Sequence, residues 1–439
     1  MEGSSLWSCA RNNANDAWYF NGNYGFWDHN NMYNGYRVRP PLSNDGKFRK
    51  KEMTELTDII EAYMAARRNK RRTADQTDFE LHWESGCCRL LRDIRGRSLR
   101  PTAYTFISHR PRPREVFASD MATRVLHHYI DIRLRPLLEK EMGPHTFNNR
   151  VGMGQSACQN AVISDIYEMT EGHTGDAWVI KLDLKGCFPN IVQDIAYRQL
   201  REVVESGYKG SDKDDLLYIL QVCVFSYPVL HCEVYSSPEE RAQIEKGKSL
   251  FDKPPGIGAA IGHLIWQNAV NWYFHGIDEW LDSFPEIRHE RYVDDFYIVA
   301  KDRRVLPALV PEMRERLAAL GARLNERKFY CQHWTKGLEC LGVHIKGKNV
   351  YLNRRTVDSA VTAARHLGRP SAGRVDRALA SLNSYIGMAR RVCGYKRVME
   401  ILTAVPAGWD KFLHFNGRRQ VLEANESFRT RNVRKFNLT

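Results

Sequence analysis

The segment Arg291-Tyr-Val-Asp-Asp-Phe296 places two adjacent aspartates between two short apolar stretches. Residues 292–293 and 296–300 have the composition of β-strands, so the acidic pair falls on a hairpin turn. Acidic pairs often occur in turns without any catalytic role. Here the strand-like arms would bury the base of the turn, and carboxylates near a core are costly unless they are paired or bind a metal ion. The segment therefore predicts a two-stranded hairpin that carries a functional acidic pair.

A third acid ends an apolar strand further upstream. Residues 179–184 read Val-Ile-Lys-Leu-Asp-Leu, which places Asp183 at the end of that strand. If the two strands pair, Asp183 and Asp294 lie together, and their oxygen ligands suit two Mg²⁺ ions, with Mn²⁺ as a possible substitute. Two ions about 3.5–4 Å apart can activate a 3′-hydroxyl and stabilise a leaving pyrophosphate.

These motifs carry a family resemblance. Tyr292-Val-Asp-Asp295 resembles the Y-x-D-D box of reverse transcriptases, and Asp183-Leu-Lys-Gly-Cys-Phe188 resembles their first palm motif. The resemblance implies an RNA-directed DNA polymerase of the α+β class, a right hand with fingers, an antiparallel palm sheet backed by helices, and a helical thumb. It implies in-line attack of a primer 3′-hydroxyl on the α-phosphate of a dNTP.

The resemblance also assigns roles to individual residues. The catalytic acids are Asp183, Asp294 and Asp295, which with the Leu184 carbonyl would be the metal ligands. Phe188 falls on the steric gate that excludes a 2′-hydroxyl, and core packing is the alternative role for an aromatic residue there. Lys328 would protonate pyrophosphate. Arg114 would contact the triphosphate, since its planar fork binds phosphate oxygens in pairs.

The segment from Ile261 to Gln267 indicates which subfamily of reverse transcriptases the chain resembles. It reads Ile261-Gly-His-Leu-Ile-Trp266-Gln267 and is similar to the I-G-x-x-x-S-Q motif of diversity-generating retroelements, except that Trp266 stands in place of serine. By this resemblance Ile261, Gly262 and Gln267 approach the incoming nucleotide and the template base. Residues 148–154 resemble a fingers turn, and residues 341–345 resemble the primer-grip hairpin.

The domain boundaries follow from the motifs. We predict an Asn- and aromatic-rich arm over residues 1–45, fingers over 46–172, a palm over 173–350 with an insertion at about 206–255, and a helical thumb with a basic tail over 351–439. Apolar spacing predicts one continuous helix over about 260–280. The arm resembles the tails of lectin-like variable proteins, which suggests a translated template repeat. The alternative is an unrelated arm that packs on the enzyme or on RNA.

Composition agrees with a nucleic-acid-binding protein without requiring one. Lysine and arginine exceed the acids by 13, which favours a polyanionic partner but is also common for solubility alone. The sequence has no run of 18 apolar residues and no signal peptide, so we expect a cytoplasmic protein of a bacterial or phage-infected cell, without a membrane partner. The ten cysteines form no C-x-x-C pair, which argues against a zinc site and for reduced thiols.

Three functions are compatible with these features. The first is a polymerase that copies a template-repeat RNA into cDNA, error-prone at adenines, for targeted protein diversification. Its partners would be the template RNA, a primer, dNTPs and a small basic accessory protein. The second is another bacterial reverse transcriptase without a mutagenic role, of the retron, group II intron or phage-defence type. The third is a non-catalytic RNA-binding or lectin-like adhesion protein, which would not need the three aspartates.

Overall fold

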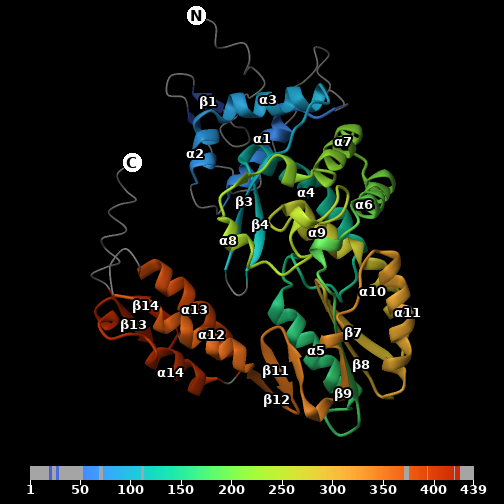
Figure 1. The fold of residues 1–439 in the computed structure, drawn as a ribbon, viewed down its shortest axis with the longest axis vertical. Coiled ribbons are helices and arrows are strands. Elements are labelled where there is room, and N and C mark those ends of the chain that lie inside the picture. The colour runs from blue at the N-terminus through green and yellow to red at the C-terminus, as the bar shows by residue number, and fades with distance from the viewer. Residues whose placement is uncertain are drawn as a thin grey trace, which may run out of the picture. The chain divides into compact units, whose positions relative to one another are not determined.

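The structure is a computed structural model. It describes residues 19–21, 26–28, 53–68, 73–109, 113–369, 375–392, 394–419 and 421–425. The chain divides into two compact units, each assembled from separate stretches of sequence. Unit 1 comprises residues 1–142, 186–276 and 320–322, and unit 2 comprises residues 143–185, 277–319 and 323–439. The two units are described separately below (Figure 1).

Unit 1 contains a helical group and a small sheet. Its helices are α1 (Leu56–Arg67), α2 (Ala74–Leu81), α3 (Trp83–Arg95), α4 (Met121–Glu141), α6 (Gln193–Gly207), α7 (Lys213–Val224), α8 (Pro238–Arg241) and α9 (Leu264–Tyr273). The long helix α4 begins where Asp120 accepts a hydrogen bond from the Thr123 amide at 2.7 Å, which caps its first turn. A buried charge network ties α4 to its neighbours: Arg133 contacts Asp58 of α1 at 2.9 Å and Asp212 before α7 at 2.7 Å.

The sheet of unit 1 has the strand order β4-β3-β6. Strand β3 (Ala103–Ser108) pairs antiparallel with β4 (Arg114–Ser119) and parallel with β6 (Glu233–Val234). The alternating burial of β3 and β4 leaves one face towards the core, where Phe117 is buried. Two short strands of the N-terminal arm, β1 (Tyr19–Asn21) and β2 (Phe26–Asp28), pair with each other. The rest of residues 1–45 lies outside the described part of the chain.

The continuous helix predicted over residues 260–280 is wrong. The chain instead forms α9 (Leu264–Tyr273) and α10 (His275–Asp282), with Phe274 between them. Tyr273 and Phe274, at the break, are both buried. The Tyr273 hydroxyl accepts a hydrogen bond from the Val192 amide at 3.2 Å and donates one to the Leu320 carbonyl at 2.5 Å. The apolar spacing predicted helical structure in this region but could not show that the helix ends at Tyr273 and a new one begins at His275.

The centre of unit 2 is an antiparallel sheet with the strand order β7-β8-β5-β9. Its strands are β7 (Ile287–Tyr292), β8 (Asp295–Ala300), β5 (Trp178–Asp183) and β9 (Tyr330–His333). Val179, Tyr297 and Val299 share one core with residues of helix α5 (Gln155–Met169). Helix α11 (Val305–Ala319) also packs against β8 and β5 (Figure 1). The middle strands are therefore apolar on both faces, which explains the continuous apolar run in residues 296–300.

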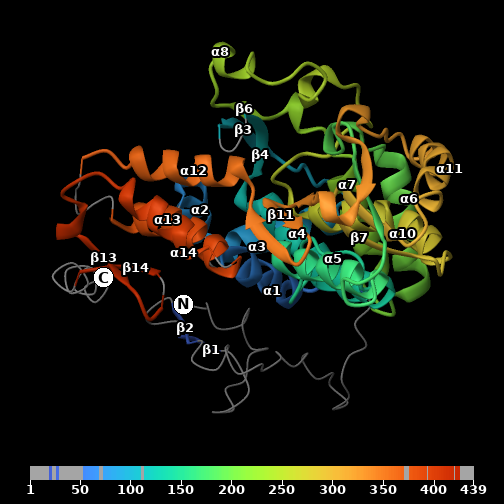
Figure 2. The same cartoon turned by 90° about the horizontal axis from the view of Figure 1, so that it is seen from below.

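The C-terminal part of unit 2 adds two further sheets and a helical group. A meander of β10 (Leu338–Cys340), β11 (Val343–Lys346) and β12 (Asn349–Leu352) follows β9, and β13 (Leu413–Asn416) pairs with β14 (Val421–Ala424). Helices α12 (Arg354–Arg365), α13 (Val375–Arg391) and α14 (Tyr395–Thr403) pack on one another (Figure 2). The apolar residues of these helices join the same core as α5 and the central sheet of unit 2.

The mixture of antiparallel sheets and helices confirms the predicted α+β class. No helix in the described ranges is long and apolar enough to cross a membrane. Every cysteine that the structure describes is a free thiol, as expected from the scattered spacing.

Candidate active site

The three aspartates lie at one end of the central sheet of unit 2. Asp183 is the last residue of β5, Asp295 is the first of β8, and the two are direct partners in the antiparallel register. Beyond that pair, the Leu184 amide donates to the Asp294 carbonyl at 3.2 Å. The pairing that the sequence required, with Asp183 beside the Asp294–Asp295 turn, is therefore present in the backbone.

Asp183 is held by a residue that the sequence did not identify. Its carboxylate accepts a hydrogen bond from the Asn325 side-chain amide at 2.9 Å, and its carbonyl accepts one from the Asn325 backbone at 2.7 Å. Asp183 is only 9% exposed, so these bonds fix the orientation of a nearly buried carboxylate. No motif pointed to Asn325, because its partner lies far away in sequence and becomes its neighbour only when the sheet forms.

Asp295 lies beside one cation and one phenol. The Lys181 ammonium is 3.6 Å from one carboxylate oxygen, and the Tyr297 hydroxyl donates to the other at 3.4 Å. Burial of the Tyr297 ring raises the pKa of that phenol well above its ordinary value, so the hydroxyl stays protonated and acts as a donor. Lys181, Asp183, Asp295 and Tyr297 thus form one polar cluster on a single face of the β5–β8 pair.

The carboxylates at this end of the sheet are of the donor type that a hard divalent cation binds. Carboxylate oxygens are the ligands that Mg²⁺ prefers, and polymerase sites commonly use one or two carboxylates together with phosphate oxygens of the nucleotide. Within the described ranges, no group of three or more histidine, cysteine, aspartate or glutamate side chains is arranged so as to hold a metal ion. Leu184, the further ligand suggested by the resemblance, is buried and forms a bridge with Leu324.

Ile261 and Gly262 lie in unit 1 against strand β4. The Phe117 amide donates to the Ile261 carbonyl at 2.7 Å. Gly262 has φ +111°, and a Cβ atom there would lie 2.4 Å from the Phe117 carbonyl oxygen. Glycine is required here because the backbone adopts a left-handed conformation and also approaches another backbone closely. Arg114, the predicted triphosphate contact, is the exposed first residue of β4.

The structure explains why tryptophan stands at residue 266, where the I-G-x-x-x-S-Q motif has serine. Trp266 is 2% exposed and belongs to the core of unit 1, while the neighbouring Gln267 on α9 is half-buried. The tryptophan therefore replaces the motif's serine as a packing residue.

The structure describes the surroundings of Phe188 and the backbone of Lys328, two further residues with predicted roles. Phe188 begins a short 3₁₀ turn (Phe188–Asn190) in unit 1, is half-buried, and accepts a hydrogen bond from the Ala259 amide at 2.8 Å. Its role as a steric gate stays a prediction. Lys328 ends another 3₁₀ turn (Glu326–Lys328), and its side chain lies outside the described part of the chain.

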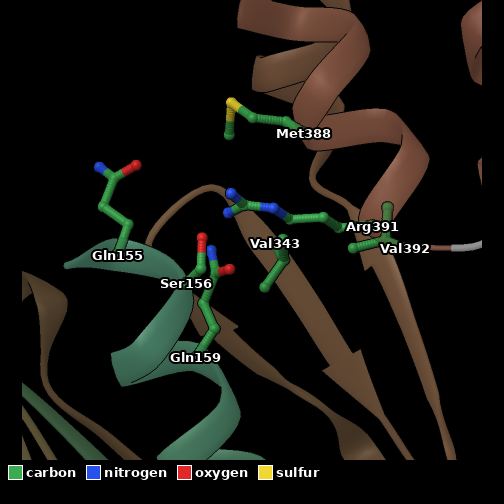
Figure 3. Close-up of a pocket in the computed structure, with 7 residues that line it drawn as sticks. All are labelled: Gln155, Ser156, Gln159, Val343, Met388, Arg391 and Val392. Carbon is green, nitrogen blue, oxygen red and sulfur yellow. The ribbon is translucent and has the colours of Figure 1, made fainter. Parts of the chain in front are cut away.

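A polar pocket opens in unit 2 where α5, β11 and α13 meet (Figure 3). The Arg391 side chain of α13 extends towards Ser156 and Gln159 in the first turns of α5 (Figure 3). Gln159 also donates to the Leu341 carbonyl at 2.9 Å, which fixes the turn between β10 and β11 that was predicted to be a primer-grip hairpin. The full lining is Gln155, Ser156, Gln159, Val343, Met388, Arg391 and Val392.

Comparison with known proteins gives a family match over the middle of the chain. The model of the reverse transcriptase (RNA-dependent DNA polymerase) family matches residues 111–345, which is more than half of the 439 residues. No curated protein matches the chain.

Solved structures that resemble the chain include yeast telomerases. Apo telomerase from Candida tropicalis is 11% identical, with a TM-score of 0.44 over 69% of this chain and 57% of that one. Telomerase from Candida albicans in complex with a TWJ fragment of telomeric RNA is 13% identical, with a TM-score of 0.40 over 76% of this chain and 64% of that one. The chain thus spans less than two thirds of the length of these telomerases.

Proposed function

Because the chain belongs to the reverse transcriptase (RNA-dependent DNA polymerase) family, we propose that it is an RNA-directed DNA polymerase whose reaction centre contains Asp183, Asp294 and Asp295. The observation that carries this proposal is the register of β5 and β8, which pairs Asp183 with Asp295 directly beside Asp294. Acids at adjoining strand ends have little structural value, because like charges repel and burial is costly. They have a clear chemical value for a reaction that needs divalent cations.

We propose Mg²⁺ as the cation, with Mn²⁺ as a substitute, and Asp183 and Asp294 as its firmer ligands. When bound, the ions would lower the pKa of the primer 3′-hydroxyl and neutralise the charge that develops on the phosphates. Asn325 would keep the Asp183 carboxylate oriented towards the ions through its 2.9 Å hydrogen bond. Lys181, 3.6 Å from Asp295, would limit repulsion between the clustered acids before the ions bind.

The substrates we propose are a template RNA, a primer and dNTPs. Arg114 is exposed on β4 and suits a triphosphate contact, and Phe188 and Lys328 keep the steric-gate and pyrophosphate roles implied by the family resemblance. In unit 2, Arg391 and the polar side chains of the α5 pocket suit the phosphate backbone of a primer–template duplex (Figure 3). Contacts of this kind hold a duplex without reading its sequence.

Replacing Asp294 tests the assignment. Asp294→Ala should abolish dNTP incorporation in a primer-extension assay while RNA binding persists, because the change removes a metal ligand and leaves the basic surfaces intact. Asp302→Ala is the matched control: it removes an acid just beyond the other end of β8, where the exposed Arg304 side chain pairs with Asp302 at 2.7 Å. Polymerisation that survives in Asp294→Ala, or that is lost equally in the control, would contradict the proposed centre.

We further propose that the enzyme is of the diversity-generating type and copies a template-repeat RNA with errors at adenines, together with a small basic accessory protein. The support is the Ile261-Gly262 pair with Gln267, and the Asn-rich arm of residues 1–45. Sequencing of cDNA made by the purified protein, with and without the accessory protein, tests this. An error rate at template adenines equal to that at the other three bases would leave a reverse transcriptase without a mutagenic role.

A further inference from the structure

The turn that carries Asp294 contains a strained residue. Val293 and Asp294 form the two-residue connection between β7 and β8, since Tyr292 and Asp295 are paired. Val293 has φ +58°, in the left-handed region. Two-residue hairpin turns with a positive φ at the first position normally use glycine there, and a β-branched residue in this conformation is an outlier. Such a conformation persists only where the surrounding structure enforces it.

The buried Arg291 contacts the turn and supports the left-handed conformation of Val293. The side chain of Arg291 is fully buried, and its guanidinium donates to the Val293 carbonyl at 3.3 Å. The same guanidinium forms a two-pronged salt bridge with Asp278 of α10, with distances of 2.8 Å from Nε and 2.5 Å from Nη2. Thr146 completes the group: its hydroxyl donates to Asp278 at 3.0 Å and accepts from Arg291 at 3.1 Å.

The backbone of Arg291 is fixed as firmly as its side chain. Its amide donates to the His145 carbonyl at 2.8 Å, and its carbonyl accepts from the Phe147 amide at 3.1 Å. On the other side it is the register partner of Phe296 in β8. The guanidinium is therefore anchored to Asp278 of helix α10 and to Thr146, both within unit 2, and it also contacts the strained turn through the Val293 carbonyl.

We propose that Arg291 is a positioning residue for the polymerase reaction. Held by Asp278 and Thr146, it keeps the Val293 carbonyl in place, and this fixes the left-handed turn and the direction in which Asp294 leaves the sheet. The inference rests on the proposed function, because it concerns the placement of one of the three acids. A misplacement of about 1 Å at a reacting centre can reduce the rate about 100-fold.

The alternative is that Arg291 only stabilises unit 2, and a rescue experiment separates the two roles. Lysine cannot replace the forked geometry of Arg291, so Arg291→Lys should lower kcat for dNTP incorporation by about 10- to 100-fold. The KM for dNTP and the affinity for RNA should change less than about twofold, because the proposed triphosphate contact at Arg114 and the proposed duplex contact at Arg391 are unchanged. Adding Val293→Gly should restore most of the lost kcat, since glycine adopts a positive φ without support.

Two controls keep the test interpretable. Arg133→Lys changes another buried arginine, in unit 1, whose side chain is 6% exposed and pairs with two acids, and it should lower the melting temperature without a selective fall in kcat. If Arg291→Lys does not fold, Thr146→Val removes only the shared hydroxyl and should still lower kcat several-fold. The proposal is overturned if Val293→Gly fails to rescue kcat, or if Arg133→Lys shows the same fall. Activity that persists in Asp294→Ala would instead refute the proposed function itself.

Discussion

Gly262→Ala is expected to detach the segment before α9 from strand β4. Gly262 has φ +111°, and an added Cβ would lie 2.4 Å from the Phe117 carbonyl oxygen and 3.1 Å from a Val116 methyl. Restoring a separation of even 3.0 Å requires a backbone shift of 3.0 − 2.4 = 0.6 Å. Because the opposing atom belongs to a strand backbone, no side-chain rotation can relieve the clash.

The magnitude has two parts. A left-handed backbone costs an alanine about 1–2 kcal/mol relative to glycine. The shift also weakens the 2.7 Å hydrogen bond from the Phe117 amide to the Ile261 carbonyl, and an unsatisfied buried donor costs about 1–3 kcal/mol. Gly262→Ala should therefore lower the free energy of unfolding by about 2–5 kcal/mol in total.

Gly256→Ala is the matched comparison. Gly256 has φ +84°, but an added Cβ there meets no atom within 4 Å. It should therefore show only the conformational cost of about 1–2 kcal/mol. Urea denaturation gives the two free energies, and hydrogen exchange of the β4 segment reports the Phe117 amide. Equal destabilisation by the two variants, or full protection of that amide in Gly262→Ala, would refute the close-approach argument.

Two further predictions concern unit 1. Desolvation lowers the pKa of the buried His263 imidazole to about 4. The unfolded chain therefore binds this proton at a higher pH than the folded chain does, and the free energy of unfolding falls as the pH drops below about 6.5. Between pH 7 and pH 5 this histidine should reduce the free energy of unfolding by about 2 kcal/mol, and denaturation curves of His263→Leu should show a smaller reduction than those of the wild type. Arg133→Met leaves Asp58 and Asp212 buried without their shared cation. It should therefore lower the free energy of unfolding, measured by urea denaturation, by about 3–5 kcal/mol. A decrease below about 1 kcal/mol would show that water replaces the arginine.

The sequence predicted the parts of the fold that depend on local patterns. The apolar stretches that end at Asp183 and follow Asp295 form β5 and β8, whereas β7 is largely charged and Val293 lies in the connection between β7 and β8. Acids at strand ends are visible in sequence because they interrupt an apolar run.

The supporting residues could not be predicted in the same way. Asn325 contacts Asp183, and Asp278 and Thr146 contact Arg291, through pairings set by the assembled fold. None of the three interrupts a local pattern. Arg291 is visible in the sequence as a charged residue inside a strand, and a buried strand tolerates a charge only if a partner reaches it.

Gly262 and Val293 show two solutions to the same backbone problem. Both adopt a positive φ near residues assigned to the reaction. At residue 262 a neighbouring backbone excludes any side chain, so only glycine is possible. At residue 293 a side chain fits, and the conformation is enforced by the buried Arg291 from outside the turn. The two sites should therefore respond oppositely to substitution: alanine at 262 disrupts its segment, whereas glycine at 293 is tolerated and removes the dependence on Arg291.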